Sequence, residues 1–458
     1  MTIAFHFVTA HVLSVVGFAM AALLAADVLR GDRAPGTTYA WLLAILFVPY
    51  LGVPLYLALG GRKLARMARS KNDLYAGTRA AGAGASHLER MLCGLGAPPA
   101  RAGQELAILG TGEQAFAAVM ATLESATQAI EISTLILADD EVGRAVLDCL
   151  ERKARAGVVV RVLIDGLFAF HSPRRRLRAL QKAGGQVARF MPVLHSPFRG
   201  RTNLRLHRKI VAVDGQEAIV GGMNIAREYM GPTPLAGRWR DISVRLRGAA
   251  AADLVAIFRS DWAFATRSAP LSAPAPVDVS GRSTVEVVGS GPDVPSDLLY
   301  DAFLTGVFRA ERRLWIATPY FIPDEALTRA LVLAARRGVD VRVLAPARSN
   351  HRLADLAGAS TFRRVAAAGV KVLAYGPGML HAKLMVIDDE VAIVGSANFD
   401  MRSLFLDYEV ALFCSSAPDI AAAGGWFEEA ARSTVSLPPA TRTRAMVERL
   451  ARLIGPLV

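Results

Sequence analysis

Cysteine is scarce in this chain, and the cysteines present are not spaced as metal ligands. The 458 residues include three cysteines, Cys93, Cys149 and Cys414, which are far apart and lack the CxxC spacing of zinc sites. The sequence therefore indicates neither a disulfide framework nor a structural zinc site. Because no other cluster of metal ligands stands out, we predict that any catalysis here needs no metal and no cofactor.

Charge is missing from two long stretches near the N-terminus. Residues 3–26 and 40–61 contain no Asp, Glu, Lys or Arg, and each stretch is long enough to cross a bilayer as a helix. A cleaved signal peptide is the alternative for the first stretch, but it would begin with basic residues, and none precedes Arg30. We therefore predict a retained transmembrane hairpin over residues 1–61, with its second helix kinked or partly re-entrant at two prolines.

The basic residues around this hairpin predict its orientation. The short connection between the two stretches holds only Arg30, Asp32 and Arg33. The second stretch is followed at once by Arg62, Lys63, Arg66, Arg69 and Lys71. Cytoplasmic flanks of membrane helices are enriched in Lys and Arg, so we expect both the N-terminus and the large C-terminal part in the cytoplasm.

Acidic residues are absent from residues 166–213, which contain eleven Lys or Arg. Such a field attracts phosphate groups, either of lipid head groups or of nucleic acid. A merely solvated basic face is the alternative. The predicted membrane hairpin favours an anionic lipid as the partner, and we expect no nucleic acid.

One short pattern occurs twice. The segments LHRKIVAVD (206–214) and LHAKLMVID (380–388) both read H-x-K-x4-D, and GGMN (221–224) and GSAN (395–398) follow at the same distance. The candidate residues of the two patterns are His207, Lys209, Asp214, His381, Lys383 and Asp388, with Asn224, Ser396 and Asn398 from the following elements. Two copies in one register are much harder to obtain by chance than a single match.

The register also predicts a geometry. Asp214-Gly215 between two apolar runs is a signal for a hairpin with a two-residue turn. Since side chains alternate along a strand, His207, Lys209 and Asn224 would then share one face. The second copy, turning at residues 388–389, would gather its own histidine, lysine, serine and asparagine in the same way.

These side chains suit a phosphoryl group. Lysine and asparagine donate hydrogen bonds to its oxygens, while histidine attacks phosphorus or transfers a proton. A single copy could equally be a basic strand surface, but duplication argues against that alternative. Sequence symmetry alone does not decide which histidine attacks.

With these two motifs, the chain resembles the phospholipase D superfamily, and within it the bacterial cardiolipin synthases. Leu206 departs from the pattern, because asparagine usually precedes the first histidine. Further similar segments are NLRLHRK (203–209), GGMNIAREYM (221–230), RWRDISVR (238–245), SGPD (290–293), TPYFIPDEAL (318–327), NFDMRSLFLDYEV (398–410) and ARLIGPL (451–457).

The resemblance implies a reaction and roles for residues. It implies transfer of a phosphatidyl group between two phosphatidylglycerol molecules at the bacterial inner membrane, through a phosphohistidine on His207, with His381 as acid and base. It also implies that Asp241 and Glu409 orient the histidines, while Asp214 and Asp388 suit structural roles at the turn tips. The alternatives are a hydrolytic phospholipase D, a superfamily nuclease and a catalytically silent lipid-binding protein.

The chain beyond the hairpin repeats itself, which predicts its fold class. Strand and helix patterns at 130–165 recur at 314–346, a further strand follows each, at 186–190 and 370–375, and we expect an α/β sandwich with a largely parallel sheet in each half. The duplicated motif favours a pseudo-twofold pair over two independent domains. The predicted divisions after residue 61 are a basic juxtamembrane connection (62–100), a first half (101–268), a linker (269–277), a second half (278–435) and a basic amphipathic segment (436–458).

Overall fold

The computed structural model describes residues 17, 19, 21–29, 35–59, 71–75, 77–191, 204–294, 296–436 and 441–452. Its described part divides into an N-terminal unit that ends at Lys71 and a large unit that begins at Asn72. Both copies of the duplicated motif lie in the large unit.

The N-terminal unit contains short helices. Residues 21–29 are helical, α2 spans Pro35–Phe47 and α3 spans Pro49–Leu59, so the second uncharged stretch is broken at Val48. Pro49 begins the new helix because the first helical position needs no amide donor. No helix in the described part of the chain has the length and apolarity needed to span a membrane, so the predicted transmembrane hairpin is not confirmed. Residues 3–16 of the first stretch lie outside the described residues.

These helices share a small core and leave much apolar surface exposed. Ile45, Val53 and Tyr56 are buried against each other, and the Tyr56 hydroxyl donates a hydrogen bond of 2.8 Å to Asp27. The large apolar side chains that remain exposed in this unit are Leu23, Leu29, Tyr39, Leu43, Leu46, Phe47, Val48, Tyr50 and Leu51.

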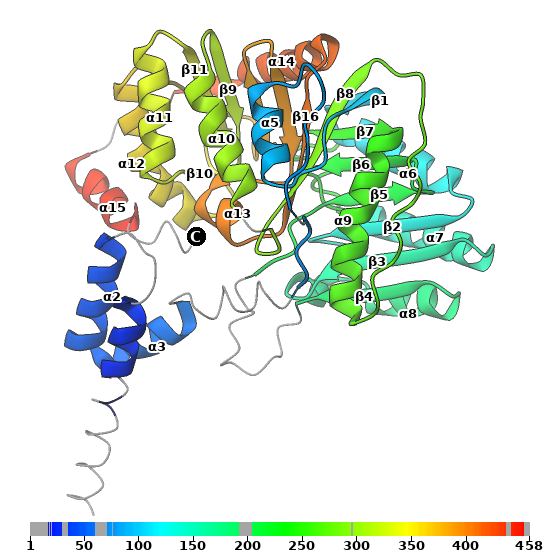
Figure 1. The fold of residues 1–458 in the computed structure, drawn as a ribbon, viewed down its shortest axis with the longest axis horizontal. Helices are drawn as coiled ribbons and strands as arrows, with labels where there is room; N and C mark the ends of the chain where they lie inside the picture. Colours follow the sequence, from blue (N-terminus) through cyan, green and yellow to red (C-terminus); the bar gives the residue numbers. More distant parts are fainter. Residues whose placement is uncertain are drawn as a thin grey trace, which may run out of the picture. The chain divides into compact units, whose positions relative to one another are not determined.

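A single 15-stranded sheet runs through the large unit (Figure 1). Its strand order shows two equivalent halves that are joined edge to edge. From the centre outward, the first half contains β1 (Arg101–Leu109), β7 (Ser243–Arg247), β6 (Glu217–Gly221), β5 (Ile210–Val213), β2 (Ala129–Thr134), β3 (Val159–Asp165) and β4 (Gln186–Phe190). The second half contains β8 (Ser283–Ser290), β16 (Glu409–Cys414), β14 (Val391–Gly395), β13 (Leu384–Ile387), β9 (Arg313–Ala317), β11 (Asp340–Pro346), β12 (Lys371–Tyr375) and the edge strand β17 (Thr434–Val435). Antiparallel pairing of β1 with β8 joins the halves.

The sheet is mixed, and the prediction of a largely parallel sheet is wrong. Among its described strands, parallel pairing is confined to β2–β3–β4 and β9–β11–β12. The motif hairpins β5–β6 and β13–β14 are antiparallel, and so are their pairings with the neighbouring strands on either side. Each hairpin therefore inserts antiparallel strands between the parallel group and the centre of the sheet. A separate parallel pair joins β10 (Phe321–Ile322) to β15 (Phe399–Asp400).

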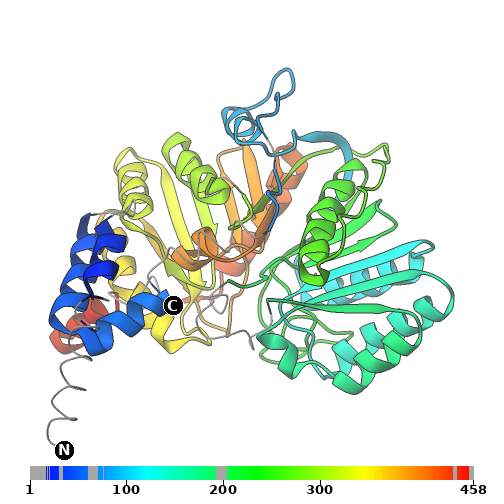
Figure 2. The ribbon, with the colours of Figure 1, turned by 60° about the horizontal axis from the view of Figure 1, so that its bottom comes forward.

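Helices cover the sheet on both faces (Figure 2). A core in the first half joins α6 (Gly112–Ser125), α7 (Glu141–Arg155) and α8 (Arg174–Lys182) to β2 and β3. A core in the second half joins α5 (His87–Gly94), α10 (Leu298–Arg309), α11 (Glu325–Arg336) and α12 (Arg352–Ala367) to β9 and β11. Between them, α9 (Ala249–Thr266) and α14 (Ala417–Ala431) enclose a core that contains β7 and β16, and thus residues of both halves. The remaining helical segments are η1 (Phe168–His171), α13 (Met401–Phe405) and α15 (Arg442–Arg452).

Equivalent helices of the two halves begin at equivalent aspartates. The Asp140 side chain accepts hydrogen bonds from the amides of Val142 and Gly143 at the start of α7. The Asp324 side chain accepts one from the amide of Leu327 at the start of α11. A carboxylate at this position satisfies amides that have no partner inside the helix, which explains why both helices begin where they do.

The motif hairpins turn through three residues, and the prediction of two-residue turns is wrong. Val213 pairs with Glu217, so Asp214, Gly215 and Gln216 form the first turn, and the second copy has a turn of the same length. Asp214 adopts a left-handed backbone with φ of 54° in this turn, and its carboxylate is bonded outside the hairpin. His207 lies before the start of β5, so it is not on a paired strand as the sequence predicted.

Candidate active site

Each motif histidine is held by a carboxylate from the opposite half of the sheet. His207 Nδ1 lies 2.7 Å from Glu409 Oε1, at the start of β16. His381 Nδ1 lies 2.8 Å from Asp241 Oδ2, shortly before β7. All four side chains are buried. Because the pairing is crossed, neither half by itself contains a complete pair of histidine and carboxylate.

The backbone fixes this crossing. The His207 amide donates to the Tyr408 carbonyl at 3.0 Å, and the Tyr408 amide donates to the Arg205 carbonyl at 2.9 Å. In the other copy the His381 amide donates to the Arg240 carbonyl at 2.7 Å. Each motif therefore forms a short parallel bridge with the segment that carries its carboxylate. Both histidines are positioned by main-chain contacts between the halves and by their side chains.

The motif lysines are buried beside the histidines. Lys209 Nζ donates to the His207 carbonyl at 2.7 Å, and Lys383 Nζ donates to the His381 carbonyl and lies 2.7 Å from the Nδ1 atom of that ring. Burial lowers the pKa of Lys209 to about 8, and burial together with the charge of Lys209 lowers the pKa of Lys383 to about 7. Two buried ammonium groups that disfavour each other's charge would both be stabilised by a bound anion.

Both histidines are neutral at physiological pH. Burial lowers the pKa of His207 to about 4, and the opposing charge of Glu409 only partly compensates. Burial, with Lys383 and Lys209 adding to it, lowers the pKa of His381 well below its ordinary value. Because Nδ1 of His207 faces a carboxylate, Nε2 carries the free electron pair. A neutral imidazole held in this way can act as a nucleophile.

The two copies differ beside the carboxylates. A Cβ atom at Gly222 would lie 2.3 Å from Asp241 Oδ1, so glycine leaves the room that this carboxylate occupies. At the equivalent position of the second copy, the Ser396 hydroxyl donates a hydrogen bond to Glu409 Oε2. Glu409 thus accepts a hydrogen bond from Ser396, whereas Asp241 lies against Gly222, which has no side chain to donate one.

The charge states of the two carboxylates also differ. Burial disfavours the ionised form of Glu409, but His207, Lys209 and the Ser396 hydroxyl outweigh it and lower its pKa. Burial raises the pKa of Asp241 to about 7, and Lys383 only partly opposes this rise. At neutral pH, Glu409 is therefore ionised, while Asp241 is divided between its two forms.

The predicted asparagines contribute buried amide groups. Asn224 Oδ1 accepts a hydrogen bond of 3.3 Å from the Ile136 amide. Within the described residues, Asn224 Nδ2 and Asn398 Oδ1 are buried without a hydrogen-bond partner. Buried polar atoms are normally paired, so the Asn224 amide is a donor suited to an oxygen of a bound anion.

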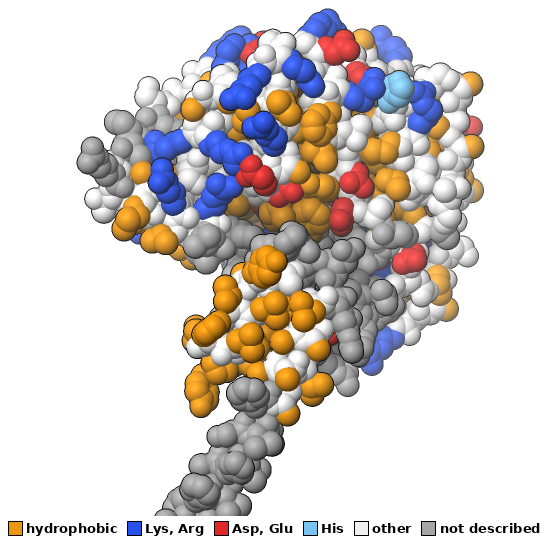
Figure 3. Space-filling view, turned by 60° about the vertical axis from the view of Figure 1, so that its left-hand side comes forward, with side chains coloured by type: hydrophobic (Ala, Val, Ile, Leu, Met, Phe, Trp, Pro, Cys, Tyr) orange, Lys and Arg blue, Asp and Glu red, His pale blue; other side chains and the backbone are white. Residues whose placement is uncertain are grey.

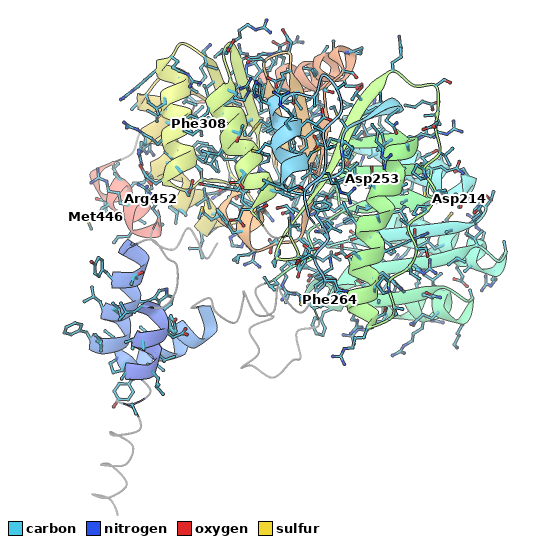
Figure 4. All side chains as sticks on the ribbon, viewed as in Figure 1. Asp214, Asp253, Phe264, Phe308, Met446 and Arg452 are labelled. Carbon is cyan, nitrogen blue, oxygen red and sulfur yellow. The ribbon has the colours of Figure 1, made fainter. Side chains whose placement is uncertain are left out.

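The turn aspartates, Asp214 and Asp388, do not belong to the cluster formed by the motif histidines, the motif lysines and the two carboxylates. Asp214 lies at a hairpin tip (Figure 4) and accepts hydrogen bonds from the amides of Gln128 at 2.8 Å and Ala129 at 2.7 Å, where β2 begins. Asp388 accepts two of 2.8 Å from the amides of Arg312 and Arg313, where β9 begins. Each aspartate therefore links the turn of its hairpin to the start of the neighbouring strand.

We expect Asp214→Ala to lower stability without removing the chemistry. The substitution leaves the amides at residues 127–129 without their acceptor, so the free energy of unfolding should fall by about 1–3 kcal/mol. Urea unfolding and turnover per folded molecule measure the two effects, with Gln216→Ala in the same turn as the control. Loss of turnover in a variant that unfolds like the parent would contradict this structural role.

Aromatic rings enclose His381, a feature that our sequence reasoning missed. The centroid of the His381 ring lies 5.1 Å from that of Tyr229 and 5.4 Å from that of Trp239, and the two aromatic rings are 4.7 Å apart. Among the described residues, no such ring contact is found for His207. The sequence held one signal for this contact, because Trp239 lies two residues before the predicted site residue Asp241 in RWRD.

Sequence reasoning also missed Arg208, the residue between His207 and Lys209. Arg208 is fully buried, with Nη1 2.6 Å from Asp261 Oδ1 and Nη2 3.2 Å from Asp293 Oδ1. Its Nε atom donates to the carbonyl of Glu409 at 2.9 Å. The second copy has alanine at this position, so the comparison of the two motifs gave no signal.

Comparisons with known proteins agree with this geometry. Residues 119–262 and 307–430 match the family described as "Cardiolipin synthase, PLD-like domain", and residues 19–61 match "Phospholipase_D-nuclease N-terminal". The chain is 35% identical over 402 residues to a cardiolipin synthase of Geobacillus sp. (strain WCH70), covering 83% of this chain and 80% of that protein. It is 34% identical over 444 residues to cardiolipin synthase A of Pseudomonas entomophila (strain L48), covering 92% of each.

A solved structure shares the fold. The phosphatidylserine synthase of Haemophilus influenzae Rd KW20 superposes with a TM-score of 0.62 at 15% identity, covering 77% of this chain and 95% of that one. The family model and the two cardiolipin synthases confirm the resemblance noted in the sequence. With two phospholipase D-like halves and the matched family model across both, this chain belongs to the cardiolipin synthase family of the phospholipase D superfamily.

Proposed function

We propose that this chain is a membrane-bound phosphatidyltransferase that makes cardiolipin and glycerol from two phosphatidylglycerol molecules. The observation that supports this most directly is the crossed pair of buried histidines, each with its carboxylate, beside two buried lysines. Two histidines provide a nucleophile and a separate proton donor, which the two-step displacement of a phosphodiester requires. The lysines provide positive charge for the phosphate oxygens.

In the first step, His207 Nε2 attacks the phosphorus of one phosphatidylglycerol. A P–N bond forms, the bond between phosphorus and the glycerol oxygen breaks, and His381 protonates the departing oxygen. The ionised Glu409 supports this role of His207, because a carboxylate at Nδ1 stabilises the imidazole as it gains positive charge. The bound phosphate, an anion, raises the pKa of His381 so that this ring carries the required proton.

In the second step, a hydroxyl of the other phosphatidylglycerol attacks the phosphohistidine. His381 takes the proton of that hydroxyl, the P–N bond breaks, and cardiolipin leaves with His207 restored. Lys209, Lys383 and Asn224 stabilise charge on the phosphoryl oxygens in both steps. No atom is lost between the steps, so two phosphatidylglycerol molecules give one cardiolipin and one glycerol.

We propose further that the N-terminal unit attaches the enzyme to the bacterial inner membrane, with the large unit on the cytoplasmic side. Apolar side chains cover the visible face of this unit, in the lower part of Figure 3. Tyr50 is 96% exposed and Phe47 is 77% exposed, which is unfavourable in water and favourable in a lipid bilayer. The two-helix transmembrane hairpin and the predicted divisions at 101–268, 269–277 and 278–435 form part of this proposal.

One experiment tests the proposed reaction. The membrane-reconstituted chain is incubated with labelled phosphatidylglycerol, and separately with single-stranded DNA, and the products are identified for the parent, His207→Ala and His381→Ala. Cardiolipin with glycerol supports transfer. Phosphatidate as the main product would instead identify a hydrolytic phospholipase D, and DNA fragments a nuclease.

Trp239 provides a test of how transfer is favoured over hydrolysis. Trp239 is half-buried against the His381 ring, and its loss would admit water beside the ring that takes the proton of the attacking hydroxyl. We expect Trp239→Ala to raise the ratio of phosphatidate to cardiolipin several-fold, measured with labelled phosphatidylglycerol. Trp239→Phe keeps an aromatic ring and serves as the matched control. An unchanged ratio in Trp239→Ala would exclude this role for the ring.

A further inference from the structure

Helix α15 (Arg442–Arg452) contacts the neighbouring helices of the large unit through its charged side. Glu448 is 1% exposed and accepts hydrogen bonds from Arg363 of α12 at 2.9 and 3.0 Å, as well as one of 3.0 Å from Arg444 of its own helix. One turn further on, Arg452 lies 3.1 Å from Glu325 of α11. Ion pairs on one side of the helix therefore hold it against α11 and α12.

The apolar side of α15 points away from the protein. Met446 is 62% exposed, Val447 is 44% exposed and Leu450 is 58% exposed. At helical spacing these three side chains share one face, and Glu448 lies on the opposite face. Helices on soluble domains usually bury the apolar face and expose the charged one, so α15 has the inverse arrangement.

The charges beside this face are basic. Arg449 is exposed, the side chain of Arg444 remains about half-exposed, and the single acidic residue of the helix, Glu448, is buried in its ion pairs. An apolar strip flanked by exposed arginines matches the interface of an anionic bilayer. Three side chains are too small an area for a stable protein partner, which needs about 800 Å² from each side.

We propose that α15 is a second membrane contact, whose face of Met446, Val447 and Leu450 enters the interfacial region of a bilayer rich in anionic phospholipid. The ion pairs of Glu448 with Arg363 and of Arg452 with Glu325 transmit the orientation of this helix to the catalytic half. The proposal rests on the membrane attachment proposed above, but not on the chemistry. Met446 and Arg452 are labelled in Figure 4.

Site-specific fluorescence in the full chain tests this inference. The native cysteines are buried, at 0%, 0% and 2% exposure for Cys93, Cys149 and Cys414, so a new surface cysteine can be labelled selectively. The chain carrying Leu450→Cys with an environment-sensitive fluorophore is reconstituted into vesicles of phosphatidylserine and phosphatidylcholine that contain a lipid-borne quencher. Val159→Cys, at a position 41% exposed on β3 of the other half, is the matched control.

We expect strong quenching and a blue-shifted emission at position 450 and weak quenching at position 159. Met446→Glu in the Leu450→Cys chain should reduce the quenching, and removal of phosphatidylserine should do the same. Equal quenching at both positions would overturn the proposal. So would a blue shift in detergent that depends on protein concentration and persists without lipid, because it would identify a second copy of the chain as the partner.

The readout needs no turnover, which separates this inference from the proposed function. If cardiolipin forms while position 450 stays unquenched, the inference about α15 fails alone. If position 450 is quenched while no cardiolipin forms, the proposed reaction fails alone.

Discussion

Replacement of His207 by alanine should lower kcat for cardiolipin formation by about 10⁴-fold or more, as expected when a covalent nucleophile is removed. The reason lies in the asymmetry of the two copies. His207 is held by Glu409, whose pKa is lowered by His207, Lys209 and the Ser396 hydroxyl, whereas the partner of His381 has a pKa near neutrality. His207 therefore has the stronger support for the charge that develops on a nucleophilic ring.

A trapping measurement separates the two histidines. Rapid denaturation during turnover of phosphorus-labelled phosphatidylglycerol should leave label on the chain of His381→Ala, which cannot easily complete the second step, and none on His207→Ala. His171→Ala, at an exposed histidine outside the cluster, is the matched control and should keep parental turnover. Label retained on His207→Ala would assign the nucleophile to another residue.

Arg208→Met should cost about 3–5 kcal/mol in the free energy of unfolding, the expected size for breaking a buried ion-pair network from one side. Arg208 is fully buried, and its guanidinium group pairs with two buried carboxylates, Asp261 of α9 and Asp293 of the loop after β8. It also donates to the carbonyl of Ser290 at 3.1 Å. Without the arginine, both buried carboxylates lose this positively charged partner.

Urea unfolding followed by tryptophan fluorescence in detergent measures this effect. Arg144→Met removes an arginine from an exposed pair with Asp139, where the two side chains are 51% and 55% exposed, and should change stability by less than about 1 kcal/mol. A loss in Arg208→Met as small as that of this control would show that the buried network adds little. Turnover is expected to fall as well, because Arg208 also holds the carbonyl of Glu409.

The sequence predicted the positions of the two hairpins, because duplication makes register visible. Strands β4 and β12 lie where the repeat predicted further strands, and both motifs lie at the ends of antiparallel hairpins. The turn length was predicted incorrectly, because Asp-Gly between apolar runs favours a two-residue turn but also fits the three-residue turn that is present. The mixed character of the sheet was missed because strand direction depends on how the hairpins insert between distant strands.

The crossed pairing could not be predicted from sequence. Asp241 and Glu409 were expected to orient histidines, but a linear sequence does not indicate which carboxylate meets which ring. The role of Arg208 could not be predicted either, because its partners Asp261 and Asp293 lie 53 and 85 residues away in the sequence. Trp239 adjoins a predicted residue, yet its contact with His381 arises only when the halves meet.

The exchange of carboxylates between the halves has a consequence for how such a chain can change over generations. A gene duplication usually frees one copy to drift, but here each copy carries the group that orients the other copy's histidine. A mutation near Asp241 would change the position of His381, and one near Glu409 would change the position of His207. The two repeats therefore form one functional unit, because a change in either repeat alters the surroundings of the histidine in the other.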